Sequence, residues 1–263
     1  MIDHGKFRLD GRHVAVVGAA SGIGEAVALA CGRQGARVAC VDLNALGAER
    51  VASQIREEGG RASAHAGDIS ESSQIETLMA ELDRLAPLEG LACTPGVNVR
   101  KPLLSYTDEE FERVVRVNLR GNFNVLRAAG RLMTARGRGS IVLFSSIRAQ
   151  VVEPGQSVYA ATKAGVLQLA KAAAAEFGPH GVRVNALGPG VTETPLTQPI
   201  KSAPDWYAAY AAKSVFNRWA TAGEMAWPTV FLLSDASSYV TGTMLVVDGG
   251  WLAADGRFTP PGM

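Results

Sequence analysis

Short apolar runs recur along this chain, and each ends where the polarity changes abruptly. Val14 to Val17 is followed by Gly18, and Val38 to Val41 is followed by Asp42. Unbroken apolar runs of this length are typical of parallel strands that are buried on both faces. We predict five further strands, at Ala62 to Ala66, Leu88 to Thr94, Ser140 to Phe144, Arg183 to Leu187 and Met244 to Val247.

Helical patterns separate these runs. Ile23, Val27, Ala30 and Cys31 share one face of a first helix. The other predicted helices are Asn44 to Glu58, a helix capped by Ser70 that ends at Leu85, a long helix that a capping box at Thr107 to Glu110 opens and that ends near Gly137, Gln156 to Phe177, and Gly223 to Leu233. Alternation of strands and helices predicts an α/β protein: a three-layer, doubly wound Rossmann fold of about seven mainly parallel strands with helices on both faces.

No repeat, low-complexity block or linker divides the 263 residues, which suits a single Rossmann-type domain spanning 1–263. We expect a cofactor half over about 1–145 and a catalytic and substrate half over about 146–263. The least regular stretch, residues 190–219, is called the lid segment below. Its aromatic residues either close over a substrate or simply pack on the body of the protein, and the sequence leaves both readings open.

Composition narrows the class of protein. The net charge is +1, so neither nucleic acid nor an anionic membrane is an expected partner. The three cysteines include no Cys-x-x-Cys pair, Met1 to Arg12 lack the apolar core of a signal peptide, and no apolar run approaches the ~18 residues of a membrane span. These features predict a cytoplasmic protein. The four histidines are scattered, so we expect no metal site.

The candidate chemistry centres on Tyr159. Lys163 follows four residues later, which puts both side chains on one helix face, and Ser146 lies thirteen residues upstream near a strand end. A neighbouring ammonium favours a phenolate and lowers the tyrosine pKa, so the phenol can exchange a proton with an alcohol or a carbonyl. Alone, a Tyr-x-x-x-Lys pair is usually a chance pattern. Here it follows a glycine-rich turn that supplies a site for a hydride acceptor.

That turn is Gly18-Ala-Ala-Ser21-Gly22-Ile23-Gly24, between the first strand and the first helix. Glycines there let a pyrophosphate approach the backbone and the helix N-terminus. Asp42 ends the second strand and is followed by Leu43, so a carboxylate without a basic neighbour faces the ribose, which favours NAD over NADP. Without the glycine turn, Asp42 would read as a turn residue. Asp68, with Ile69 beside it, either bonds the adenine amino group or caps a loop.

In this order the motifs resemble those of the short-chain dehydrogenase/reductase family over essentially the whole chain. The resemblance rests on the glycine turn, Asp68-Ile69, Asn118, Ser146, Tyr159-x-x-x-Lys163, Asn185, Pro189-Gly190 and Val247-Asp-Gly-Gly250. It implies that Tyr159 is the acid/base, that Lys163 also holds the nicotinamide ribose, and that Ser146 orients the substrate oxygen. It also implies that Asn118 holds a water linking Lys163 to solvent, and that Pro189, Gly190, Thr192 and Thr194 hold the carboxamide.

Two positions depart from the family pattern. Val17 stands where the family usually has threonine, and Cys93-Thr94-Pro95-Gly96 replaces Asn-Asn-Ala-Gly. Thr94 and Gly96 are still expected beside the cofactor, but Thr94 replaces an amide that braces the sheet and Pro95 has no N–H to donate. The resemblance therefore does not fix which hydrogen bonds form around the adenosine half of the cofactor. The Ser/Tyr/Lys set is unaffected by these two departures.

The expected reaction is hydride transfer between NAD and a secondary alcohol or ketone. In relatives that act on short hydroxy acids, residues at the positions of Asn98, Arg148 and Gln156 face the substrate. Arg148 then either pairs with a carboxylate or polyol, or points to solvent or a neighbouring subunit. Hydroxy acid, polyol and cyclic alcohol remain open as substrates. The alternatives are an NADPH-dependent 3-oxoacyl-thioester reductase and a non-catalytic NAD-binding protein. The resemblance also implies a homotetramer, or a dimer.

Overall fold

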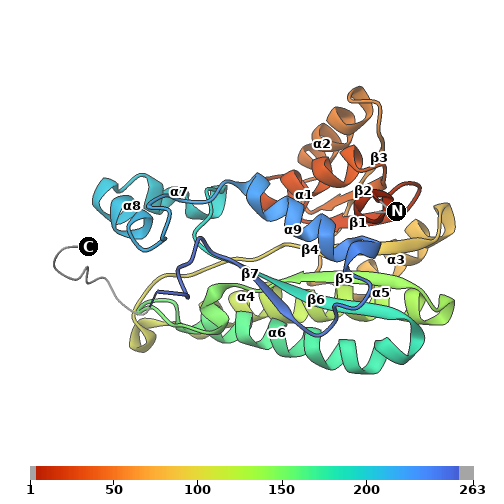
Figure 1. Ribbon diagram of the computed structural model, residues 1–263. Coiled ribbons are helices and arrows are strands. Elements are labelled where there is room, and N and C mark those ends of the chain that lie inside the picture. The colour runs from red at the N-terminus through yellow and green to blue at the C-terminus, as the bar shows by residue number, and fades with distance from the viewer. Residues whose placement is uncertain (1–3, 255–263) are drawn as a thin grey trace.

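A single parallel sheet organises the computed structural model, which describes residues 4–254. Its seven strands lie in the order β3-β2-β1-β4-β5-β6-β7, and every neighbouring pair is parallel (Figure 1). Their bounds are β1 His13–Val17, β2 Arg37–Asp42, β3 Arg61–Ala66, β4 Leu88–Cys93, β5 Gly139–Phe144, β6 Val182–Pro189 and β7 Met244–Val247. The predicted doubly wound Rossmann fold and its seven strands are confirmed.

Helices cover both faces of this sheet. On one face α1 (Gly22–Arg33) packs against α9 (Ala222–Leu233) and α2 (Ala45–Glu57), and their apolar side chains meet alternate residues of the strands, such as Val14 and Val16. On the other face α3 (Ser72–Leu85), α5 (Asn122–Arg136) and α6 (Ser157–Phe177) bury a second cluster with Ala15 and Val17. The strands are apolar on both sides because each side meets a layer of helices.

The sheet changes its winding direction between β1 and β4. The chain runs outward through β2 and β3, returns to β4, and then continues outward on the other side. At such a switch point the loops after two adjacent strands separate, and they open a crevice at the carboxyl edge of the sheet. The glycine turn that follows β1 and residues 94–98 that follow β4 therefore come together there.

The predicted long helix is one continuous stretch with an irregular middle. It begins at α4 (Asp108–Val115), behind the Thr107/Glu110 capping box, and passes through a π-helical stretch, η3 (Arg116–Gly121), into α5. Gly137 ends it in the left-handed conformation that glycine tolerates. The π-helical stretch contains Asn118, and such stretches often accompany functional sites.

Ser70 is not the helix cap that the sequence suggested. Helix α3 begins two residues later and its N-cap is Glu71, which makes no side-chain capping bond. The Ser70 hydroxyl and amide both donate to Asp68 Oδ1, at 2.8 Å each. Because Asp68 already closes this turn, the chain enters the helix only after it.

The lid segment, residues 190–219, forms the short helices η6 (Pro195–Thr197), α7 (Gln198–Lys201) and α8 (Pro204–Ala211) at one end of the molecule (Figure 1). Tyr207, Tyr210 and Trp219 pack with Trp251 in an aromatic cluster. The aromatic residues of this segment therefore do pack on the body, and Tyr210 also lines the cavity described below. Packing on the body is thus observed, whereas closure of this segment over a substrate stays a prediction.

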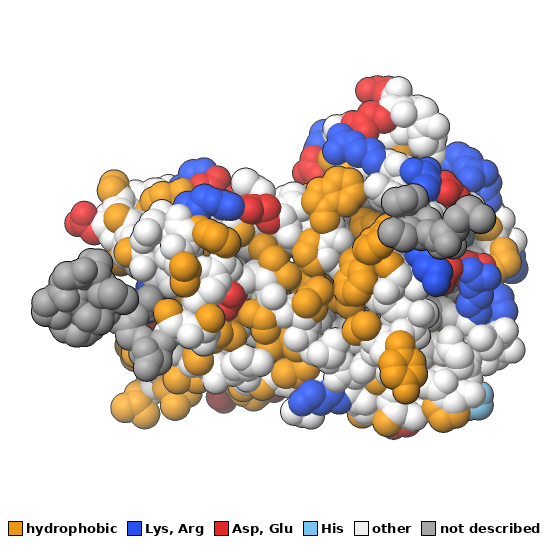
Figure 2. All heavy atoms as spheres, in the orientation of Figure 1, with side chains coloured by type: hydrophobic (Ala, Val, Ile, Leu, Met, Phe, Trp, Pro, Cys, Tyr) orange, Lys and Arg blue, Asp and Glu red, His pale blue; other side chains and the backbone are white. Residues whose placement is uncertain are grey.

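On the face shown in Figure 2, charged side chains gather over α2 and the β3 end of the sheet, whereas hydrophobic side chains lie between α8 and α9. None of the described helices is both long and apolar enough to cross a membrane. Cys31, Cys40 and Cys93 are free and buried, and burial raises the pKa of each thiol to about 12.

Candidate active site

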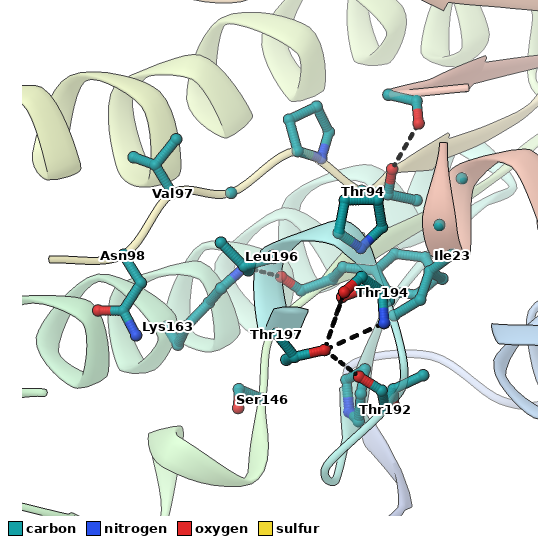
Figure 3. Close-up of a pocket in the computed structure, with 18 of the residues that line it drawn as sticks. Ile23, Thr94, Val97, Asn98, Ser146, Lys163, Thr192, Thr194, Leu196 and Thr197 are labelled. Atoms are coloured by element: carbon teal, nitrogen blue, oxygen red, sulfur yellow. Dashed lines mark hydrogen bonds between the residues drawn. The ribbon is translucent and has the colours of Figure 1, made fainter. Parts of the chain in front are cut away.

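A cavity of about 440 Å³ lies at the carboxyl edge of the sheet, at the switch point between β1 and β4. It contains residues from both predicted halves of the chain (Figure 3). All predicted site residues except Asn118 line it: Gly18, Ser21, Gly22, Ile23, Gly24, Asp42, Leu43, Asp68, Ile69, Thr94, Gly96, Asn98, Ser146, Arg148, Gln156, Tyr159, Lys163, Pro189, Gly190, Thr192 and Thr194.

The glycine turn is held closed by its own backbone. A Cβ on Gly24 would overlap the carbonyl of Gly18, and a Cβ on Gly18 would overlap the Thr94 hydroxyl, so neither position admits a side chain. Ser21 is the N-cap of α1 but makes no side-chain capping bond. The first amides of α1 therefore lie at the cavity without a side-chain acceptor, which is the arrangement that binds a phosphate.

Thr94 stands where the family has a side-chain amide that braces the sheet, and it braces the sheet as well. Its amide donates to the carbonyl of Val17 at 3.0 Å, and its hydroxyl donates to the same carbonyl at 2.9 Å. The hydroxyl also lies 3.4 Å from the carbonyl of Gly18. The departure at this position thus keeps β1 and β4 tied together just below the glycine turn.

The Asp42 carboxylate is fixed in the cavity by backbone donors. Its Oδ2 accepts from the amide of Ala20 and its Oδ1 from the amide of Asn44, both at 2.9 Å. Leu43 beside it is exposed. The nearby cation Arg50 donates to the carbonyl of Ala20 at 3.1 Å, and its ion pair with Glu25 at 2.8 Å compensates its charge. This corner of the cavity offers a carboxylate and no uncompensated cation among these residues.

Asp68 lies further along the same wall. The Asp68 Oδ1 accepts the two hydrogen bonds from Ser70 that are described above, so Asp68 caps this loop. Oδ2 makes no hydrogen bond to a described residue, and Asp68 is one of the residues that line the cavity. Ile69 is buried against Gly121 of η3, which connects this wall to the irregular stretch of the long helix.

Tyr159, Lys163 and Ser146 meet at the other end of the cavity. Tyr159 and Lys163 lie one turn apart on α6, and the Lys163 Nζ is 5.6 Å from the centroid of the Tyr159 ring. Nζ also donates to the carbonyl of Phe144 at 2.8 Å, at the end of β5. Ser145 fastens the same elements because its hydroxyl donates to the carbonyl of Lys163 at 2.8 Å. Strand β5 thereby fixes α6 where the tyrosine faces Ser146.

Burial raises the pKa of Tyr159, which is opposite to the direction expected from Lys163. A hydrogen bond with Ser146 and the charges of Arg100 and Arg148 lower it again in part. Burial also lowers the pKa of Lys163 to about 8, so this side chain carries less positive charge than an exposed lysine. The direction differs from the expected one because desolvation of the phenol is the largest cause, and Lys163, which donates to the Phe144 carbonyl, is not among the groups that lower this pKa.

Asn118 acts on the site from behind the cavity wall. Its Oδ1 accepts from the amide of Val97 at 2.8 Å, and its Nδ2 donates to the carbonyl of Val97 at 2.9 Å and to the hydroxyl of Thr162 at 3.2 Å. The side chain thus joins the loop after β4 to helix α6. A water-holding role remains a prediction, whereas the brace is visible in the structure.

The loop after β6 has an organiser that the sequence did not reveal. Thr197 Oγ1 donates to the carbonyl of Thr192 at 2.8 Å and accepts from the amide of Thr194 at 3.0 Å (Figure 3). Gly190 lies so close to Asp248 that a Cβ there would approach the Asp248 Cα to 2.6 Å. These contacts bring Thr192 and Thr194 over the cavity, beside the glycine turn.

The three predicted substrate residues are joined through a fourth, Glu153. Asn98 Nδ2 donates to Gln156 Oε1 at 3.1 Å, and Gln156 Nε2 donates to Glu153 Oε2 at 2.7 Å. Arg148 forms an ion pair with the same oxygen of Glu153. Arg148 is therefore buried and paired, rather than directed to solvent.

Sequence reasoning missed Glu153, Arg100 and Tyr210, which complete this end of the site. Tyr210 donates its hydroxyl to Glu153, and Arg100 Nη1 lies 3.3 Å from the Tyr210 hydroxyl. Nothing in the sequence could have joined them, since they belong to a loop after β4, a loop after β5 and a helix of the lid segment.

Comparison with known proteins gives long matches. Residues 18–252 match a family model described as enoyl-(acyl carrier protein) reductase. The chain is 37% identical to a galactitol 2-dehydrogenase (L-tagatose-forming) of Cereibacter sphaeroides, over 93% of this chain and 96% of that protein. It is 38% identical to a D-threitol dehydrogenase of Mycolicibacterium smegmatis, over 93% and 94% of the two chains.

Solved structures agree with these matches. A gluconate 5-dehydrogenase from Burkholderia cenocepacia, in complex with NADP and tartrate, has a TM-score of 0.90 and 32% identity, over 95% of this chain and 98% of that one.

Proposed function

Because the chain belongs to the short-chain dehydrogenase/reductase family, we propose that it is an NAD-dependent secondary alcohol dehydrogenase and ketone reductase. Family membership makes it an oxidoreductase acting on CH–OH groups. One observation carries the finer assignment: Ser146, Tyr159 and Lys163 meet at the end of the cavity whose other end is the glycine turn. A substrate alcohol can therefore lie between the proton acceptor and a bound dinucleotide.

The cavity fits a dinucleotide. The uncapped first turn of α1 would hold the pyrophosphate, and Asp42 would accept from the ribose hydroxyls. Asp68 and Ile69 would flank the adenine, and Thr192 and Thr194 the carboxamide. The fixed carboxylate of Asp42, with Arg50 already bound to Glu25, favours NAD over the 2′-phosphate of NADP. This preference differs from the NADP found in the Burkholderia relative, so the two cofactors must be compared directly.

The nicotinamide, when bound, supplies the hydride chemistry. Tyr159 takes the proton of the alcohol during oxidation and returns it to the carbonyl during reduction. Ser146 donates a hydrogen bond to the substrate oxygen as negative charge develops on it. Burial keeps the Tyr159 phenol protonated near neutral pH, so the free protein is poised to donate a proton.

Lys163 and Asn118 support these groups. Lys163 lies against the Tyr159 ring, and with its pKa near 8 it can exchange a proton in the working range. In addition we propose that Lys163 holds the nicotinamide ribose, while Asn118 fixes the loop after β4 against α6 and orients a water beside Lys163. Asn118 is thus a positioning residue.

The substrate is a small alcohol or ketone, and Asn98, Arg148 and Gln156 are proposed to line its binding site. By their names two of the relatives act on galactitol and D-threitol and a third acts on gluconate. The two polyol dehydrogenases have the higher identity, 37% and 38% against 32%, which supports polyols among the classes left open by the sequence. We further propose a cytoplasmic homotetramer, as the family resemblance implies.

Initial rates of NAD and NADP reduction across a panel of polyols, hydroxy acids and cyclic alcohols test this function. We expect NAD-dependent turnover with one class, and its loss in Tyr159→Phe. Turnover that survives in Tyr159→Phe would contradict the assigned acid/base. NADH binding without turnover on any alcohol would favour a binding protein instead.

A further inference from the structure

Glu153 lies behind the lining of the substrate end of the cavity, at the centre of a polar network whose other members line it. Its Oε2 accepts from Arg148 and from Gln156, and its Oε1 accepts from Tyr210 and lies 3.8 Å from Arg100. These partners come from the loop after β4, the loop after β5 and the lid segment. One carboxylate therefore joins three of the segments that form this end of the cavity.

The buried charges in this network cancel. The side chains of Arg148 and Glu153 are 7% and 18% exposed, and each compensates the other. Arg100 is the remaining cation, but its side chain is 31% exposed and its guanidinium lies 5.4 Å above the Trp206 ring. Water and salt screen the charge of an exposed group far better than that of a buried one. The inner wall thus presents hydrogen-bonding groups without a net charge.

We propose that Glu153 is a specificity-determining residue that directs this site to neutral, polyhydroxylated substrates and disfavours carboxylates. The inference rests on the proposed function. A substrate carboxylate beside Arg148 would meet a guanidinium whose charge Glu153 already compensates from behind, so the repulsion from Glu153 would offset the attraction of the arginine. Hydroxyl groups meet no such limit, since they can accept from Arg148 or Gln156 and donate to Asn98, which lines the cavity and whose Oδ1 has no hydrogen-bond partner among the described residues.

Helix α8 also contacts a second glutamate, Glu193, through a tyrosine hydroxyl, but no buried arginine of the described residues lies beside that glutamate. Glu193 accepts from the Tyr207 hydroxyl and from Lys201, both at 2.8 Å, and no described arginine of the substrate end contacts it. Glu153–Tyr210 and Glu193–Tyr207 both fasten α8 through a tyrosine hydroxyl. A purely structural role would make the two glutamates equivalent, whereas a specificity role belongs to Glu153 alone.

The test compares kcat/KM for galactitol with that for galactonate, and for threitol with that for threonate. Each pair differs only in whether one end is a hydroxymethyl group or a carboxylate. The wild-type protein should prefer the polyol in both pairs. Glu153→Gln removes the charge but keeps the shape, and should lower the ratio of polyol to carboxylate by about tenfold or more, chiefly through KM.

Three further variants separate charge from packing. Glu153→Asp keeps the charge and should restore most of the preference. Tyr210→Phe removes one hydrogen bond to Glu153 and should weaken both substrates alike, and Glu193→Gln should leave the ratio unchanged. Thermal melting and NADH titration of every variant confirm that it is folded.

A ratio that is equal in the wild-type protein and in Glu153→Gln would overturn the inference, as would a wild-type preference for the carboxylates. Those results leave the dehydrogenase assignment standing, because turnover itself is retained. Absence of turnover on every alcohol in the wild-type protein would instead remove the proposed function, and the inference with it.

Discussion

The two ends of the cavity are formed by different kinds of contact. At the adenosine end the contacts are mostly backbone: glycines without room for a Cβ, amides at the start of α1, and an Asp42 carboxylate held by two amides. At the substrate end the contacts are between side chains, and they converge on Glu153 from three separate segments. A backbone cradle is fixed once the fold forms, whereas a side-chain network changes with single substitutions.

This difference separates cofactor binding from substrate choice. The adenosine end rests on β1, β2 and β4 at the centre of the sheet, and the substrate end depends on loops and on the lid segment. Substitutions at one end should therefore leave the other largely intact. The predictions below test that separation, beginning with the largest expected effect.

Tyr159→Phe should lower kcat by about 10³-fold, within the range that general acid–base groups supply. NADH affinity should stay nearly unchanged, because the phenol hydroxyl belongs to the reacting end of the cavity. Stopped-flow turnover and fluorescence titration of NADH measure the two quantities. A parallel loss of both would show that the two ends are not separable.

Gly24→Ala should abolish NADH binding and destabilise the protein by about 1–3 kcal/mol, the usual cost of overpacking. The added methyl group would overlap the Gly18 carbonyl, and the backbone there has no room to move. Gly178→Ala is the matched control, since a Cβ there meets nothing within 4 Å. Equal melting temperatures for the two variants would contradict the packing argument.

Asp42→Asn should reduce the preference for NAD over NADP by roughly 10-fold or more, because the hydrogen bonds to a charged acceptor that it weakens are worth about 1.5–3 kcal/mol. The amide keeps an acceptor for the turn, so the fold should survive. The ratio of kcat/KM for the two cofactors measures the effect. An unchanged ratio would mean that Asp42 only closes its turn.

The pH dependence should differ between the two reaction directions. Oxidation needs the unprotonated Tyr159, whose pKa is raised by burial, so its rate should climb about tenfold per pH unit through neutrality. Reduction needs the protonated phenol and should stay flat there, falling only when the pH passes the raised pKa. Rate profiles at saturating cofactor measure both; an oxidation rate that is flat through neutrality would place the controlling group elsewhere.

Thr94→Val should have the smallest effect, a loss of about 1 kcal/mol in the free energy of unfolding, because one hydroxyl bond to the Val17 carbonyl is removed. The Thr94 amide still donates to that carbonyl, so the strands stay paired. Chemical denaturation measures the change. A loss of NADH binding with unchanged stability would assign the hydroxyl to the ligand instead.

Sequence patterns predicted the sheet, its helices and the adenosine end because these rest on local rules. Apolar runs mark buried strands, and glycine spacing marks a turn that must pass close to its own backbone. The Ser70 cap failed because the Ser70 hydroxyl and amide both donate to Asp68, so Ser70 belongs to the turn before the helix and α3 begins only at Ser72.

The substrate end was only half predictable for a different reason. Their positions in the sequence predicted that Asn98, Arg148 and Gln156 lie at this end of the cavity. The sequence did not predict their contacts, since Glu153 pairs with Arg148 and accepts from Gln156. The direction of the Tyr159 pKa shift was missed for the same reason: it depends on burial, which is a property of the assembled fold.

The most direct test of the proposed reaction follows the hydride itself. Galactitol or threitol carrying deuterium at its carbinol carbons is incubated with NAD and the protein. The NADH formed is isolated, and its mass is measured by mass spectrometry. Direct hydride transfer predicts NADH that carries one deuterium atom. NADH without deuterium, or no NADH with any alcohol of the panel, would contradict the assignment of this protein as an NAD-dependent secondary alcohol dehydrogenase.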